Sequence, residues 1–173
     1  MKRMCEIRPI GIFSLLVLLP LGIITIGIVF GVLGYDWVLF RLFRLSGLVS
    51  LLCFLGWLFS IYNNIGQKDE KTNNKTITFN RCVSLGIILL VLTTILDLAP
   101  GHKFAIFICA NMLGFIANIF IVVAIYRVAL KLSKYDAGSN RFATWGYFFL
   151  LIFNPIGIWF VQPRVIEICK KNK

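Results

Sequence analysis

Charged residues are scarce in this chain of 173 residues. They make up 14% of it, whereas 59% of the residues are hydrophobic and the mean hydropathy is +0.88. An average soluble protein has roughly 25% charged residues. This composition leaves too little polar surface to cover a water-soluble globule. It therefore excludes an ordinary soluble domain and indicates an integral membrane protein.

Residues that carry acid–base or metal chemistry are also few. The chain has one histidine and seven acidic residues, and it has no HExxH, Gly-x-Ser-x-Gly or phosphate-binding glycine motif. Its cysteines number five and show no CxxC spacing, which argues against a disulfide framework and a zinc site. We therefore expect no enzymatic activity, no cofactor and no metal centre.

Long apolar runs dominate what is present. Four of them come close to the ~20 residues that a transmembrane helix needs, and they cover residues 10–33, 45–62, 83–99 and 104–126. The hydrophilic stretch 63–81 predicts a loop on the cytoplasmic side. Pro20 lies inside the first run and predicts a break or kink there. The sequence thus predicts an all-α membrane domain over residues 1–173, a helical bundle of four transmembrane helices plus a C-terminal segment.

That C-terminal segment, residues 142–161, contains an Asn-Pro pair. Pro155 lacks the N–H group that a continuing helix requires, and it disfavours a helical conformation at Asn154, so we expect a break near Phe153. Two alternatives follow. The segment is either a kinked fifth spanning helix or a re-entrant segment whose residues 156–162 return in extended form.

The distribution of lysine and arginine favours the re-entrant alternative. With four spans and a returning segment, 15 of the 18 basic residues lie on the cytoplasmic side, compared with 11 for five full spans. Cytoplasmic loops of membrane proteins carry the excess of basic residues. We therefore expect both termini to be cytoplasmic in a cell membrane. Contacts with anionic lipid headgroups explain the net charge of +11, and no nucleic-acid partner is predicted.

Two asparagines are the main candidate functional residues. Asn111 and Asn118 are seven residues apart, hence on one helical face, with Gly114 between them. Amides and glycines on one face either hold packed membrane helices together or line a pore. Asn154 joins this set if the last segment folds inward.

Asp97 is the one acidic residue within an apolar run. An intramembrane carboxylate is a functional candidate by default. This one lies near the end of its run, where His102 or Lys103 is an alternative partner that would give it a purely structural role.

Two functions remain compatible with these observations. The first is an oligomeric membrane protein that forms a passive pore or small transport path, lined by the asparagines with Asp97 near its mouth. The second is a non-catalytic accessory or scaffold subunit that binds a larger membrane protein. The predicted partners are therefore lipid headgroups together with either a second copy or another membrane protein.

Overall fold

Helices account for nearly all of the described part of the chain. The computed structural model describes residues 8–65, 73–98, 104–136 and 141–171, and no strand occurs among them. In chain order the elements are α2 (Pro9–Phe13), the π-helical η1 (Ser14–Leu18), α3 (Leu19–Val32), α4 (Asp36–Asn64), α5 (Asn73–Leu98), α6 (Phe104–Asp136), α7 (Arg141–Ile152) and α8 (Asn154–Lys171).

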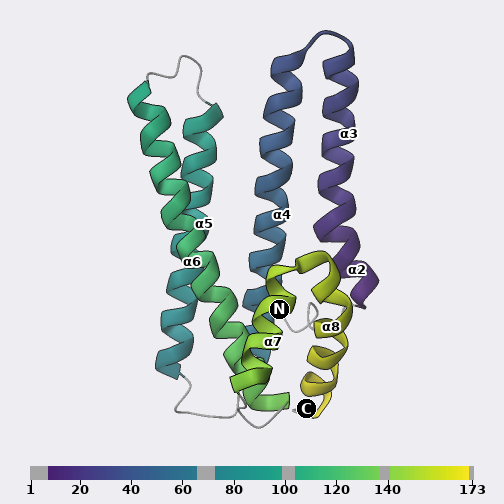
Figure 1. Cartoon of the computed structure of the whole chain (residues 1–173), viewed down its shortest axis with the longest axis vertical. Coiled ribbons are helices and arrows are strands. Elements are labelled where there is room, and N and C mark those ends of the chain that lie inside the picture. The colour runs from purple at the N-terminus through teal and green to yellow at the C-terminus, as the bar shows by residue number, and fades with distance from the viewer. Residues whose placement is uncertain (1–7, 66–72, 99–103, 137–140, 172–173) are drawn as a thin grey trace.

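Four helical stretches are long and apolar enough to cross a membrane, which confirms the predicted all-α bundle. They are Pro9–Val32, Asp36–Asn64, Thr76–Leu96 and Ile108–Asp136. Figure 1 shows two long pairs of neighbouring helices, α3 with α4 and α5 with α6, and the end of α3 and the end of α5 lie at the same end of the bundle. A shorter hairpin of α7 and α8 lies at the other end, where the chain also terminates (Figure 1).

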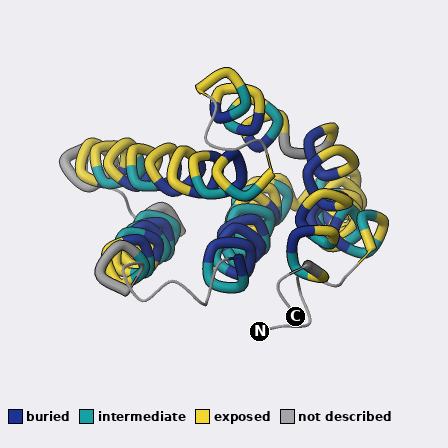
Figure 2. Tube along the Cα trace, turned by 90° about the horizontal axis from the view of Figure 1, so that it is seen from below, coloured by how far each residue is buried: buried dark blue, intermediate teal, exposed yellow. Residues whose placement is uncertain are grey.

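The two ends of the bundle are packed differently. The two long pairs come together near α7 and α8 and move apart toward the end of α3 and the end of α5 (Figure 1). We call residues 54–65, 121–136 and 141–171 the packed end, and residues 19–50 and 104–118 the open end. Many helical residues are exposed along their outward sides, as Figure 2 shows.

The sequence predicted a break or kink at Pro20. The helical path continues through this residue, but its regular α-helical hydrogen bonding is interrupted just before it. The chain instead forms the π-helical turn η1, in which the Leu19 N–H bonds to the Ser14 carbonyl five residues earlier. Pro20 has no N–H for the Leu16 carbonyl, four residues before it. The Ser50 hydroxyl on α4 donates to that carbonyl at 3.1 Å. A neighbouring helix thus replaces the lost bond, as is common in membranes.

Glycines bring α3 and α4 close together. A Cβ atom at Gly27 would lie 3.2 Å from the Leu42 Cβ, and one at Gly31 would lie 3.0 Å from a Leu39 methyl carbon. Gly34 has a φ of +86°, a backbone conformation that favours glycine, in the turn between the two helices.

Several helices extend beyond the predicted spans. The loop predicted over 63–81 is shorter in the structure, because α4 continues to Asn64 and α5 already begins at Asn73. Likewise α4 begins at Asp36, and α6 continues to Asp136. A helix satisfies its backbone hydrogen bonds internally, so it need not end where its apolar residues end.

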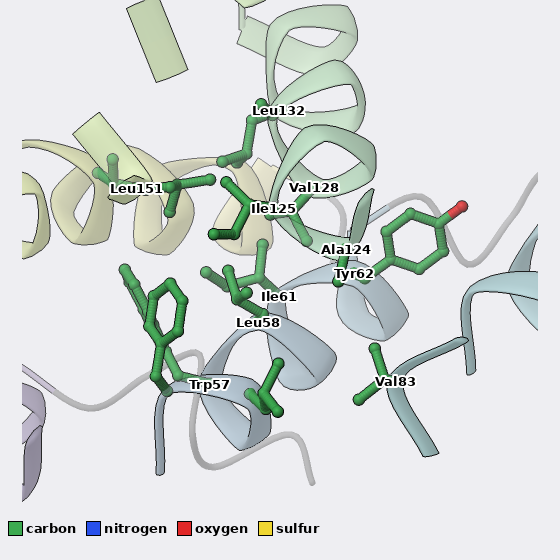
Figure 3. Close-up of a cluster of buried hydrophobic side chains, with 14 of the residues drawn as sticks. Trp57, Leu58, Ile61, Tyr62, Val83, Ala124, Ile125, Val128, Leu132 and Leu151 are labelled. Atoms are coloured by element: carbon green, nitrogen blue, oxygen red, sulfur yellow. The ribbon is translucent and has the colours of Figure 1, made fainter. Parts of the chain in front are cut away.

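The best-covered side chains lie at the packed end. Figure 3 shows Leu58 and Ile61 of α4 near Ile125 and Val128 of α6, with Leu151 of α7 beside them. All five are buried. The fully buried large side chains come from α4, α6, α7 and α8 and from the residue after α4: Leu55, Leu58, Ile61, Ile65, Val128, Leu132, Leu151, Ile158, Val161, Gln162 and Val165.

Candidate functional site

The C-terminal segment folds into a hairpin of two helices. Helix α7 ends at Ile152, and Phe153 begins the reversal: its carbonyl accepts the N–H groups of Ile156 at 3.0 Å and Gly157 at 2.9 Å. Pro155 is the second residue of α8, a position where its missing N–H has no intrahelical partner to lose. The break therefore lies at Phe153, as predicted.

The return of this segment is helical, so the predicted extended return of residues 156–162 is wrong. Helix α8 covers Asn154–Lys171, and in Figure 1 it runs back toward the end from which α7 started. An extended segment would leave backbone groups without partners in an apolar environment, whereas a helix pairs them internally.

Gly157 permits the close contact between the two short helices. A Cβ atom at this position would lie 1.6 Å from the Leu150 carbonyl oxygen and 2.5 Å from its carbonyl carbon. Real Cβ atoms do not approach backbone this closely, and backbone cannot move aside as the end of a side chain can. Only glycine therefore fits at residue 157 with the helices at this separation.

A buried hydrogen bond fixes α8 against α4. The Trp57 Nε1–H group donates to the Gln162 Oε1 atom at 2.9 Å, and both residues are buried. These residues are 105 positions apart in the sequence. Nothing in the sequence indicated this pair, because neither residue belongs to a recognisable motif.

Polar contacts with α6 fix the base of the hairpin. Asp136 at the end of α6 accepts a hydrogen bond from the Tyr147 hydroxyl and an ion-paired bond from Arg164 at 3.3 Å. On the same side, the hydroxyls of Ser133 and Thr144 lie 2.7 Å apart. These contacts link α6 to both short helices, and no sequence motif indicated them.

The length of the hairpin determines which part of α6 it covers. Helix α7 has 12 residues, about 18 Å, whereas α6 has 33 residues, about 50 Å. The positions 111, 118, 125 and 132 form one row on α6 at a spacing of seven. Ile125 and Leu132 are buried, whereas Asn111 and Asn118 in the same row are exposed. The two predicted asparagines therefore lie beyond the part of the row that the chain covers.

Asn118 uses only part of its hydrogen-bonding capacity. Its Nδ2 group donates to the Gly114 carbonyl of its own helix at 2.9 Å. Among the described residues, that is the one hydrogen bond of this side chain. Its Oδ1 atom and second N–H thus face outward on an otherwise apolar part of α6.

Gly114 is three and four residues away from the two asparagines, so it lies on their side of α6. It also borders α5, because a Cβ atom at Gly114 would lie 3.6 Å from a methyl carbon of Thr93. Three small residues of α6 are buried at a spacing of seven: Ala110, Ala117 and Ala124. That spacing was visible in the sequence and is typical of packed membrane helices.

Two candidate side chains lie outside the described part of the structure. Asp97 is the next-to-last residue of α5 and Asn154 is the first of α8, but their side chains are not among those described. His102 and Lys103, the alternative partners of Asp97, also lie outside the described residues. The roles of Asp97 and Asn154 stay predictions.

The described residues contain no group of three or more His, Cys, Asp or Glu side chains that could hold a metal ion. Comparison with known proteins adds no functional assignment: no protein-family model, no curated protein and no solved structure matches this chain.

Proposed function

We propose that the protein is a non-catalytic, self-associating membrane subunit whose copies meet at the uncovered half of the α6 row, around Asn111 and Asn118. The single observation that carries this proposal is the change in burial along the row of positions 111, 118, 125 and 132 on α6. Ile125 and Leu132 are buried by the chain's own helices, while the two asparagines, further along the same row, are exposed.

A carboxamide facing hydrocarbon is costly, which favours a protein partner at this position. Asn118 satisfies one N–H on its own helix and leaves an acceptor and a donor outward. Interhelical hydrogen bonds from such groups stabilise association in membranes by ~1–2 kcal/mol in model peptides. A second copy is the partner that fits best, because a carboxamide is both donor and acceptor and therefore complements itself across a two-fold axis.

Charge supports an orientation for the assembly. The end at which α8 terminates carries Lys134, Arg141, Arg164 and Lys170 among its described residues. The positive-inside tendency places this end in the cytoplasm. The α7–α8 hairpin is then re-entrant from the cytoplasmic side of a cell membrane, and both chain termini are cytoplasmic.

The test is association of the full chain in lipid nanodiscs or vesicles, measured by energy transfer between labelled copies. Asn118→Leu, alone and with Asn111→Leu, should weaken association roughly tenfold. Asn118→Gln keeps the amide and should retain most of it. The control Met112→Leu changes a different exposed position of α6 and should have no effect. A wild-type chain that remains monomeric, or leucine variants that associate normally, would overturn the proposal.

A passive path between the associated copies is the second candidate function. Within one chain, the buried polar residues among those described all make hydrogen bonds inside the bundle, so they do not favour a path through it: Ser46, Ser60, Ser133, Thr144 and Gln162. A polar path would instead use the asparagines that face a neighbouring copy. Flux through vesicles that changes in Asn118→Leu while association persists would favour this function over association alone.

A further inference from the structure

Three basic residues follow one another on one side of α6 at the packed end. Arg127, Lys131 and Lys134 are spaced by four and then three residues, which places them on a common helical face. Arg127 and Lys134 are exposed and Lys131 is half-buried. This face is separate from the exposed asparagines and from the Asp136 contacts at the base of the α7–α8 hairpin.

Contacts with α4 hold the central cation of this group, Lys131. The Lys131 ammonium group donates to the Tyr62 carbonyl at 2.5 Å and lies 4.2 Å from the centroid of the Tyr62 ring. That carbonyl belongs to the last turn of α4, where a cation is favourable. The Tyr62 ring stacks on Phe79 of α5, with centroids 3.8 Å apart.

The frame around Lys131 is held by further contacts of α4. Tyr62 is buried, and the neighbouring Asn63 of α4 donates to the Asn80 side chain of α5 at 3.2 Å, which fixes the two helices relative to each other. Guanidinium and ammonium donors match the oxygens of a phosphate group.

The surroundings of the cations distinguish a lipid from a free phosphate ion. Ile116, Val123 and Leu130 continue the same side of α6 away from the basic cluster, and all three are exposed. Helix α6, at about 50 Å, exceeds the ~30 Å of bilayer hydrocarbon, so its last turns reach headgroup depth. A basic cluster at that depth, next to a strip of exposed apolar side chains, is complementary to a phospholipid, with its headgroup at the cluster and its acyl chain along the strip.

We propose that Arg127, Lys131 and Lys134 bind the headgroup of an anionic phospholipid in the adjacent leaflet, whose acyl chain lies along Val123 and Leu130. The site is formed within a single chain. It is therefore independent of whether the copies associate through α6.

The experiment titrates the full chain in detergent micelles with fluorescent phosphatidylglycerol, using fluorescent phosphatidylcholine as the zwitterionic reference. The variant Arg127→Gln/Lys134→Gln alters the two exposed cations and leaves Lys131 in place. The control Arg141→Gln/Lys170→Gln removes the same charge at the same end, from exposed positions of α7 and α8. Tyr62→Phe removes the hydroxyl of a buried residue and keeps the stacked ring and the three cations.

The proposal predicts saturable binding that the Arg127/Lys134 variant weakens roughly tenfold or more, since each basic residue near a membrane surface contributes ~1 kcal/mol. Tyr62→Phe, which leaves the cations in place, and the control should both bind as wild type. Equal losses in the variant and the control would show non-specific attraction and overturn the site. Unchanged binding in the Arg127/Lys134 variant would also overturn the site. Full competition by inorganic phosphate would overturn it as well, because it would mean that the lipid chain contributes nothing to binding.

Discussion

The packed end and the open end of this bundle are built from similarly apolar helices, yet only one of them has a core. At the packed end, Leu58, Leu132, Ile158 and Val165 are completely covered by the chain. At the open end, Val32 and Phe115 are 83% and 69% exposed. The difference arises from the α7–α8 hairpin, which adds a third layer at one end and does not reach the other.

In a membrane this contrast has a clear meaning. Lipid chains are as apolar as leucine, so an exposed apolar side chain at the open end costs little. Specificity must then come from close packing and from paired polar groups, and among the described residues most such pairs lie at the packed end. Asn118 at the open end is an exception to this pattern, since its exposed side chain makes its one hydrogen bond among the described residues to its own helix.

The largest loss of stability is expected from a substitution that fills the space between α7 and α8. Gly157→Ala places a methyl group onto the Leu150 carbonyl, so the two helices must separate and lose their packing. We expect the free energy of unfolding to fall by about 3 kcal/mol or more. Unfolding of the purified chain by sodium dodecyl sulfate, followed by circular dichroism, measures this change.

Gly146→Ala is the matched control for this prediction. It lies on α7, and a Cβ atom there has no neighbour within 4 Å. Alanine is the better helix former, so stability should change by less than ~1 kcal/mol or rise slightly. Equal stability of the two variants would mean that α7 and α8 are not held at this separation.

A moderate effect is expected from the buried polar pair of the packed end. Trp57→Phe keeps an aromatic ring but removes the N–H that donates to Gln162. Loss of the donor should lower the free energy of unfolding by ~1–2 kcal/mol. Trp145→Phe is the comparison, because Trp145 is exposed and makes ring contacts only, among the described residues. Similar losses in both variants would show that ring volume, and not the hydrogen bond, matters at residue 57.

The smallest effect is expected at the open end. Gly27→Ala brings a methyl group 3.2 Å from the Leu42 Cβ, a contact that a slight shift of α3 relieves because little else packs against that helix. We expect a loss of less than ~1 kcal/mol, measured by the same unfolding assay against Gly22→Ala, which has open space around it. A loss as large as that of Gly157→Ala would contradict the view that the open end is loosely constrained.

Individual residues show which features could be predicted from the sequence and which could not. Apolar runs of sufficient length predicted the four long helices, and Pro155 located the break at Phe153, because both depend on local backbone chemistry. Pro20 predicted a disturbance of the first helix, but the compensating Ser50 hydroxyl was not predictable, since it comes from another helix. For the same reason the contact of Gly114 with Thr93 of α5 was not predicted, because it depends on how two helices cross.

The sequence by itself determined the membrane class, the number of long helices and the position of the hairpin turn. These properties follow from hydrophobicity and from the limits that proline places on the backbone, and both act within a few residues. Only the tertiary structure decided that α8 returns as a helix and that Trp57 donates a hydrogen bond to Gln162. It also decided that the row of positions 111, 118, 125 and 132 on α6 is buried at 125 and 132 only. Those features depend on distances between segments far apart in the chain, which are set by packing and which no local pattern records.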